Sequence, residues 1–296
     1  MNLRRWLRWD DPQRQMQRSL SALAPGRALD RDGRHVEAEA KARSVAAARS
    51  RRRDNVGAAL ALNLAARAMN SQGRHAEALT EFDAVLPVFV EAFGADGPDT
   101  LNLRVQRAHA LALVARYTES EAECAAVAHI ADRSSGTAMT LLAGTARHGL
   151  IYALNGQERY AQAEALASET LASRTLAYGP LADPRVTGPL LAVLRLGLAS
   201  SLNGQGRHEE ALAEVRRADE LRRDLSDGPG HPGNGASGLI EATALLGLGR
   251  KSDARARAVA AHDEALAAFG TQHFRVAEAR ALLARIDDGD DHGGGA

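Results

Sequence analysis

An arginine recurs along the chain at a nearly constant interval, each time between two stretches that have the apolar pattern of a helix. The six positions are Arg34, Arg74, Arg116, Arg159, Arg207 and Arg250. Their successive spacings are 40, 42, 43, 48 and 43 residues. A period in this range is typical of proteins built from stacked repeats, in which each unit buries its apolar face against the next. We therefore expect an array of similar units, which more often forms a binding surface than a catalyst.

The residue after each arginine aligns the six units: His35, His75, Tyr117, Tyr160, His208 and Lys251. Small residues recur nine positions before this anchor, at Gly26, Ala66, Ala108, Ala199 and Ala242, with Ile151 as the exception. They recur again three positions after it, at Ala38, Ala78, Ser120, Ala163, Ala211 and Ala254. Six positions before the anchor the residue is large and apolar: Leu29, Met69, Leu111, Leu154, Leu202 and Leu245. This spacing predicts that each unit is an antiparallel helix pair.

Small residues on both helices of a pair let the two backbones approach closely, and the large residue fills the space beside the crossing. Ile151 therefore predicts a wider crossing in the fourth unit. Glycines before four of the arginines favour a short turn that ends the first helix in a left-handed conformation. The expected pairs are 18–50, 55–93, 98–132, 136–178, 183–225 and 232–268, followed by a capping helix at 272–287. The fold class is therefore all-α, and runs of β-branched residues typical of strands are absent from the sequence.

The small–large–small pattern resembles the tetratricopeptide repeat (TPR) family, in the variety with a period of about 42 residues that is found in kinesin light chains and bacterial proteins. The segment from Phe93-Gly94 to Asp99-Thr100 is similar to the linker of that variety. The resemblance covers about residues 18–287 and implies a right-handed α-solenoid of about six helix-turn-helix repeats with a C-terminal capping helix. Residues 1–17 are expected to form a basic N-terminal segment, and 288–296 a disordered acidic, glycine-rich tail.

In the TPR family the first helices of successive pairs line a concave groove that binds peptides. Counted from the anchors, the groove positions of this chain carry amides, imidazoles, one tyrosine and small hydroxyls, which can pair with a peptide backbone. The resemblance thus implies a peptide-binding groove made by Asn63, Arg67, Asn70, Asn102, His109, His148, Tyr152, Asn155, Ser200, Asn203 and Thr243. An equally open interpretation is that these are ordinary hydrated residues on an exposed helix face.

The sequence carries no catalytic signature. It has no His-Glu-x-x-His or Cys-x-x-Cys spacing, no phosphate-binding glycine loop and no nucleophile elbow. We therefore expect no enzyme activity, no cofactor and no metal, with the histidines mostly serving in packing. The single cysteine, Cys124, stands among Ala125, Ala126 and Val127, which indicates a small buried residue.

Three functions fit these observations. The first is a scaffold that binds a protein or peptide partner in the groove, in bacterial signalling or regulation; the low share of Lys among the basic residues suggests a bacterial source. The second is a regulatory protein that contacts nucleic acid through the basic start of the chain, where residues 1–54 hold fourteen Arg or Lys and seven Asp or Glu. The third is a self-assembling repeat module. Neither a secretion signal nor a membrane span is recognisable, so we expect a cytoplasmic protein.

Overall fold

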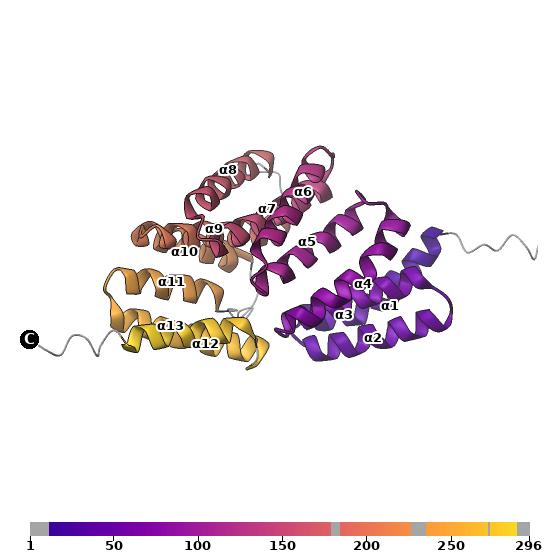
Figure 1. Ribbon diagram of the computed structural model, residues 1–296, viewed down its shortest axis with the longest axis horizontal. Helices are drawn as coiled ribbons and strands as arrows, with labels where there is room; N and C mark the ends of the chain where they lie inside the picture. Colours follow the sequence, from indigo (N-terminus) through magenta and orange to yellow (C-terminus); the bar gives the residue numbers. More distant parts are fainter. Residues whose placement is uncertain (1–11, 179–183, 226–234, 272, 289–296) are drawn as a thin grey trace, which may run out of the picture. The chain divides into compact units, whose positions relative to one another are not determined.

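The computed structural model describes residues 12–178, 184–225, 235–271 and 273–288. Over these residues the chain forms thirteen α-helices and no strand (Figure 1). The all-α prediction is confirmed. None of the described helices is long and apolar enough to cross a membrane. Most of the predicted N-terminal segment and of the predicted tail lies outside the described residues.

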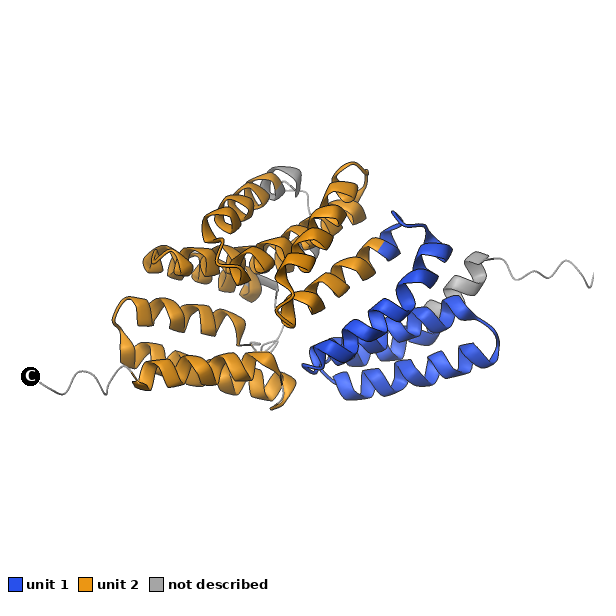
Figure 2. Cartoon of the chain, in the orientation of Figure 1, with its two compact units in different colours: residues 1–100 blue, residues 101–296 orange. Residues whose placement is uncertain are grey.

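The chain divides into two compact units, residues 1–100 and 101–296 (Figure 2). Unit 1 holds two helical hairpins. The first joins α1 (Pro12–Arg31) to α2 (His35–Arg51), and the second joins α3 (Asn55–Ser71) to α4 (His75–Phe93). Helix α2 also packs against α3, so the two hairpins are stacked.

Unit 2 begins inside α5 (Pro98–Leu113) and continues to the end of the described chain. Its other helices are α6 (Tyr117–Asp132), α7 (Thr137–Gly156), α8 (Tyr160–Tyr178), α9 (Pro184–Gly204), α10 (His208–Leu225), α11 (Ala236–Gly247), α12 (Lys251–Phe269) and α13 (Phe274–Asp288). The first helices form a layer in which α9 contacts both α7 and α11, and α11 contacts α13. The second helices pack against this layer as α7–α8, α9–α10 and α11–α12.

The observed helices match the expected pairs closely. The clearest difference is the start of the array, because α1 begins at Pro12 rather than near residue 18. Pro25 and Pro87 lie inside α1 and α4, and neither ends its helix. Helix α13 follows the sixth hairpin where a capping helix was expected. The right-handed course of the whole solenoid stays a prediction.

The small positions are buried. Ala66 and Ala78 in unit 1, and Ala199 and Ala211 in unit 2, are all 0% exposed. Among the large residues beside the crossings, Leu29 is half-buried and the other five are buried. Small buried residues on both helices let a hairpin share one apolar seam, which stabilises the pair through dispersion and the removal of apolar area from water.

The fourth hairpin accommodates its larger residue through a glycine on the next hairpin. Ile151 of α7 is 0% exposed. A Cβ atom at Gly197 of α9 would lie only 2.9 Å from Ile151 Cγ2, so the isoleucine side chain occupies the space that the glycine leaves free. The predicted widening of the α7–α8 crossing stays a prediction.

Every hairpin turn uses the same backbone conformation two residues before the anchor. Gly33, Gly73, Gly206 and Gly249 have φ between 75° and 83° there. The equivalent positions of the third and fourth hairpins are Ala115 and Glu158, with φ of 60° and 59°. In each turn the following arginine amide donates to a carbonyl five residues back, as Arg74 N does to Met69 O at 3.0 Å, and this satisfies the end of the first helix.

Candidate functional site

Each of the six recurring arginines precedes the first residue of a second helix, and its side chain folds over the residue three positions later. Arg207 donates from Nε and NH2 to the two carboxylate oxygens of Glu210 at 2.7 and 2.6 Å. The same fork joins Arg34 to Glu37, Arg74 to Glu77 and Arg116 to Glu119. Arg159 donates from Nε alone to Oε1 of Gln162, and the Nε and NH2 groups of Arg250 both contact Oδ2 of Asp253. The hydrogen bonds from Arg207 lower the pKa of Glu210, and the acidic partner also complements the positive end of the helix dipole. The arginine thus fixes the start of each second helix.

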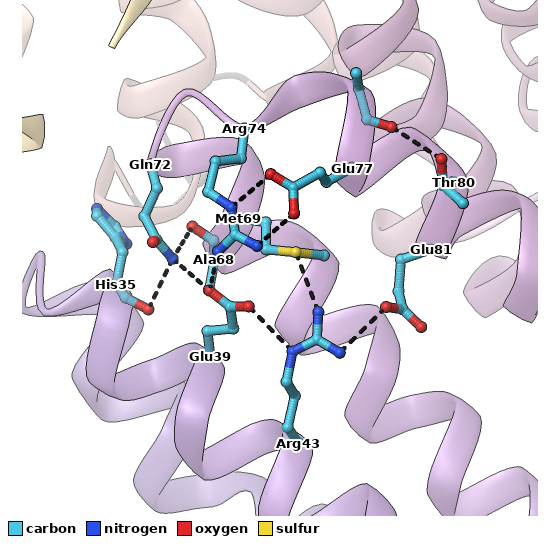
Figure 3. A network of polar contacts seen from close by, with 11 residues as sticks. His35, Glu39, Arg43, Ala68, Met69, Gln72, Arg74, Glu77, Thr80 and Glu81 are labelled. Atoms are coloured by element: carbon cyan, nitrogen blue, oxygen red, sulfur yellow. Dashed lines mark hydrogen bonds and ion pairs between the residues drawn. The ribbon is translucent and has the colours of Figure 1, made fainter. Parts of the chain in front are cut away.

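The remaining NH1 group can reach the preceding hairpin. In unit 1, Arg74 NH1 donates to Glu39 Oε2 at 2.7 Å, and Gln72 Nε2 donates to the same oxygen at 3.0 Å (Figure 3). Arg43 donates to the other oxygen of Glu39 at 3.0 Å. Glu39 is only 9% exposed, so its charge is neutralised by donors from both hairpins. We call this Glu–Gln–Arg arrangement the inter-repeat clamp.

Unit 2 contains the clamp twice. Glu121 accepts from Gln157 Nε2 at 2.7 Å and from Arg159 NH1 at 2.6 Å. Glu164 accepts from Gln205 Nε2 at 2.7 Å and from Arg207 NH1 at 2.6 Å. In each case the glutamate stands four residues after one anchor, and the glutamine stands three residues before the next. The recurring arginine therefore couples neighbouring hairpins as well as starting a helix.

A second contact between hairpins places an anchor ring on a glycine. A Cβ atom at Gly156 or Gly204 would lie 2.4 Å from ring atoms of Tyr117 or Tyr160. A Cβ atom at Gly247 would lie 2.1 Å from His208 Nε2. Each glycine is the last residue of a first helix, so the missing side chain makes room for the ring of the preceding hairpin.

These hairpins share buried small positions, a common turn and two repeated contacts with their neighbours. The described chain is a TPR-like helical repeat. No protein-family model matches it, and no curated protein matches it. Among solved structures it is similar to a tetratricopeptide repeat protein from Parabacteroides merdae ATCC 43184, with 14% sequence identity and a TM-score of 0.45. That similarity covers 90% of this chain and 99% of the other.

Three amides expected in the groove make hydrogen bonds inside the TPR-like array. Asn155 Nδ2 donates to Gly197 O at 3.0 Å, and its Oδ1 accepts from Ser201 at 2.9 Å. Asn203 Nδ2 donates to Ile240 O at 2.9 Å. Asn70 Oδ1 lies 2.7 Å from Nδ1 of its anchor, His75. Two of these amides thus join the first helices of neighbouring hairpins, and the third holds an anchor ring in place.

The other residues that were predicted to line the groove differ in their exposure and in their hydrogen bonds. Arg67 is exposed and lies 3.4 Å from Asp30, and Asn102 is exposed. The hydroxyls of Ser200 and Thr243 donate to carbonyls of their own helices at 3.0 and 2.8 Å. Asn63 is half-buried, and its buried Oδ1 has no hydrogen-bond partner among the described residues.

The structure brings three of the predicted residues together in unit 2. The rings of His109 on α5 and His148 on α7 meet edge to face, with centroids 5.7 Å apart. Loss of hydration lowers the pKa of His109 to about 4 and that of His148 to about 3, so both rings are neutral at pH 7. Tyr152 lies one turn further along α7, and burial raises its pKa, which keeps the phenol protonated.

Helix α13 contributes two residues to this surface that the sequence analysis missed. Arg275 and Glu278 are close enough to Tyr152 for their charges to act on its pKa. Arg275 is itself held against aromatic rings, with Cζ 5.7 Å from the centre of Phe269 and 5.4 Å from that of Phe274. The only available signal was the position of α13 at the end of the array, and spacing within one hairpin does not show which earlier helix it faces.

The charges of Arg275 and Glu278 on α13 act on His148 and Tyr152 of α7, which indicates that the layer of first helices is curved. Helices α9 and α11 lie between them in the layer, and packed helices stand about 8–10 Å apart. In a flat layer the charges of α13 would be too distant and too screened to affect Tyr152. Loss of hydration raises the pKa of Glu278 on the same helix. We call His109, His148, Tyr152, Arg275 and Glu278 the inner surface of unit 2.

The single cysteine and the basic run, which were also candidates for function, have the environments of ordinary structural residues. Cys124 is buried, as expected, and burial raises its pKa to about 12, so its thiolate is scarce at neutral pH. In the basic run, Arg49 pairs with Asp54 at 3.0 Å, while Arg51, Arg52 and Arg53 are exposed near the turn between α2 and α3. Among the described residues no group of three or more His, Cys, Asp or Glu could hold a metal ion.

Proposed function

We propose that this chain is a protein-interaction scaffold that binds a segment of a partner protein on the inner surface of unit 2, with Tyr152 at the centre. The observation that carries the proposal is the edge-to-face contact of His109 and His148 one turn from Tyr152, and the charges of Arg275 and Glu278 that act on Tyr152 support it. One surface thereby offers a half-buried ring, a cation and an anion drawn from separate repeats. The expected bacterial signalling or regulatory role belongs to the same proposal.

The chemistry of the inner surface suits recognition of a protein segment. Tyr and Arg are the residues that most often dominate binding energy at protein interfaces, because they combine large contact area with hydrogen bonding. Tyr152 and Arg275 have already lost much of their hydration in the free chain. A partner therefore meets a surface whose desolvation and side-chain ordering are partly complete, which lowers the cost of binding.

The predicted peptide-binding amides have a different part in this proposal. Asn155 and Asn203 are engaged with neighbouring helices, so their removal would alter the array itself. We therefore assign recognition to His148, Tyr152, Arg275 and Glu278, with His109 supporting His148. The exposed Asn102 on α5 is available to the same partner.

A photo-crosslinking experiment tests the assignment directly. A photoreactive phenylalanine analogue replaces Tyr152 in one sample and the exposed Ala122 of α6 in a matched control. Crosslinked partners are then identified by mass spectrometry from cells of the source organism. We expect a discrete adduct from position 152 only. The same set of adducts from both positions would show that the inner surface is not the binding face.

Affinity measurements with the captured partner give a second test. Tyr152→Ala removes the ring, and Arg275→Ala removes the cation. We expect each change to weaken binding by about tenfold or more, with little change in helical content by circular dichroism. If both variants bind the partner as tightly as the unchanged chain, the assignment is wrong.

A further inference from the structure

The junction between the fifth and sixth hairpins lacks the clamp found at three other junctions. At the clamp positions the sequence has Leu212 in place of the glutamate and Leu248 in place of the glutamine. Leu212 is buried in the apolar core of unit 2, and Leu248 is partly buried and packs against that core. The arginine is nevertheless retained as Arg250.

Arg250 keeps one half of its usual contacts. Its Nε and NH2 groups contact Oδ2 of Asp253 at 2.9 and 2.7 Å. No hydrogen bond or ion pair joins its NH1 group to any described residue, whereas Arg74, Arg159 and Arg207 each direct NH1 to a glutamate. An arginine positioned by its own helix thus presents a donor where a carboxylate lies at the three junctions that have the clamp.

A pocket of about 550 Å³ opens at this place between α10, α11 and α12. It is lined by Leu212, Arg216, Glu241, Leu245, Arg250, Asp253, Ala256, Arg257 and Ala260. Two of its three arginines pair with carboxylates, because Arg257 contacts Glu241 at 2.7 Å and Arg250 contacts Asp253. The third, Arg216, is exposed and has no ion pair with a described residue. Arg257 also contacts Glu264 at 3.2 Å, so Arg216 is the lining cation that is left without a carboxylate among the described residues.

We propose that this pocket receives a glutamate or aspartate side chain from a partner protein, flanked by an apolar residue. The incoming carboxylate takes the place of the missing clamp glutamate on Arg250 NH1, with Arg216 as the second cation. The flanking apolar residue packs on Leu212, Leu245 and Ala260. Charge-assisted hydrogen bonds to a guanidinium that is already oriented are among the stronger polar contacts in proteins. The proposal does not depend on the inner surface of unit 2.

The test uses two peptides that differ in one functional group: Ac-Gly-Leu-Glu-Leu-Gly-NH2 and the same peptide with Gln. The full chain, labelled with ¹⁵N, is titrated with each peptide while the arginine side-chain Nε–H signals are followed by NMR. We expect the Glu peptide to shift the signals of Arg250 and Arg216 and to bind about tenfold more tightly than the Gln peptide. The Arg207 signal should stay in place, since Glu164 already occupies its NH1 group.

Two variants give matched controls. Arg250→Gln should abolish the preference for the Glu peptide. Arg34→Gln should leave it unchanged, because Arg34 also pairs with the acidic residue three positions later and has a similar exposure, 56% against 55%, but no hairpin precedes it among the described residues. Equal binding of both peptides, or equal loss in both variants, would overturn the proposal. If inorganic phosphate shifts the same signals and binds with higher affinity than the Glu peptide, the assignment to a carboxylate is wrong.

Discussion

The NH1 group of Arg207 donates to Oε1 of Glu164 at 2.6 Å, although the two residues stand 43 positions apart in the chain. This contact joins the end of one hairpin turn to the second helix of the preceding hairpin. In a repeat array, stability is the sum of terms within each repeat and terms between neighbours. The inter-repeat clamp is a polar part of the neighbour term, and it can be altered without changing either hairpin's own core.

The clamp predicts that substitutions of Glu164 and Gln205 have coupled effects on the free energy of unfolding. Glu164→Leu leaves the Gln205 amide and an arginine donor without their acceptor, so we expect the free energy of unfolding to fall by about 1 kcal/mol. Adding Gln205→Leu should recover part of the loss, because the two leucines can then pack as Leu212 and Leu248 do. A double-mutant cycle in urea measures the coupling, expected at about 0.5–1 kcal/mol.

Glu209→Leu is the matched control for this cycle, since Glu209 is exposed on α10 and has no hydrogen bond or ion pair with a described residue. It should change the free energy of unfolding little, alone or with Gln205→Leu. Strictly additive effects of Glu164→Leu and Gln205→Leu would show that the clamp contributes no coupling.

The contact between Tyr160 and Gly204 predicts an unusual sign for a glycine substitution. Gly→Ala inside a helix ordinarily stabilises by up to about 1 kcal/mol. At Gly204 the new Cβ would lie 2.4 Å from the Tyr160 ring, so we expect Gly204→Ala to destabilise by about 1–3 kcal/mol. In a Tyr160→Ala background the same change should become neutral or stabilising. Thermal melting of the unchanged chain, the two single variants and the double variant decides between steric conflict with the ring and an intrinsic effect on the helix.

Glycine should stabilise the turns of the third and fourth hairpins. Ala115 and Glu158 have φ of 60° and 59°, a conformation that costs an L-residue about 1 kcal/mol or more relative to glycine. Ala115→Gly and Glu158→Gly should each raise the free energy of unfolding by about 0.5–1 kcal/mol. Gly206→Ala, at the equivalent turn of the fifth hairpin, should lower it. Guanidinium denaturation measures all three, and a stabilising Gly206→Ala would refute this reading of the turns.

Acid sensitivity follows from the two histidines of the inner surface. Their pKa values of about 4 and about 3 lie below the unfolded value near 6.5, so between these limits the unfolded chain binds more protons. Stability contributed by neutral His109 and His148 is therefore complete above about pH 6.5 and is lost as the pH falls. We expect each ring to cost about 2 kcal/mol at pH 5 relative to pH 7.

Urea denaturation at pH 7 and pH 5 checks this expectation. The groups that act on His148 include Arg275 and His109, so the variant should keep both. His148→Gln should reduce the difference between the two pH values. Burial also lowers the pKa of His75 in unit 1, so part of the acid sensitivity should persist in the variant. An unchanged pH dependence would show that His148 is hydrated in the folded chain.

The sequence predicted the hairpins well because their determinants are local. The small residues at Ala199 and Ala211 and the left-handed turn between them act within one hairpin, and one period is enough to detect them. Helix ends were also predictable, since the turn glycines mark them directly. The start of α1 was predicted too late because Pro12 can begin a helix, yet no repeat signal precedes it.

The contacts between hairpins were harder to predict. The sequence interpretation treated Asn155 as a group that binds a partner. In the structure its amide donates a hydrogen bond to the Gly197 carbonyl of the adjacent helix instead. Two of the three donors to Glu39 lie 33 and 35 residues away, so the local sequence, which supplies only Arg43, does not show that the carboxylate is buried. A pattern within the sequence was nevertheless available. Positions four after one anchor and three before the next carry Glu with Gln at three junctions, and two apolar residues at the other two, Leu79 with Val114 and Leu212 with Leu248.

The Leu212 and Leu248 junction gives the array two chemically different kinds of joint. Dissolved salt weakens partly exposed ion pairs, while apolar burial is insensitive to it or is strengthened by sulfate-type salts. Rising ionic strength should therefore loosen the joints at Glu121 and Glu164 before the joint that carries α11 to α13. At high salt the ion-paired junctions should therefore open first, while helices α11 to α13 stay packed on the preceding hairpin.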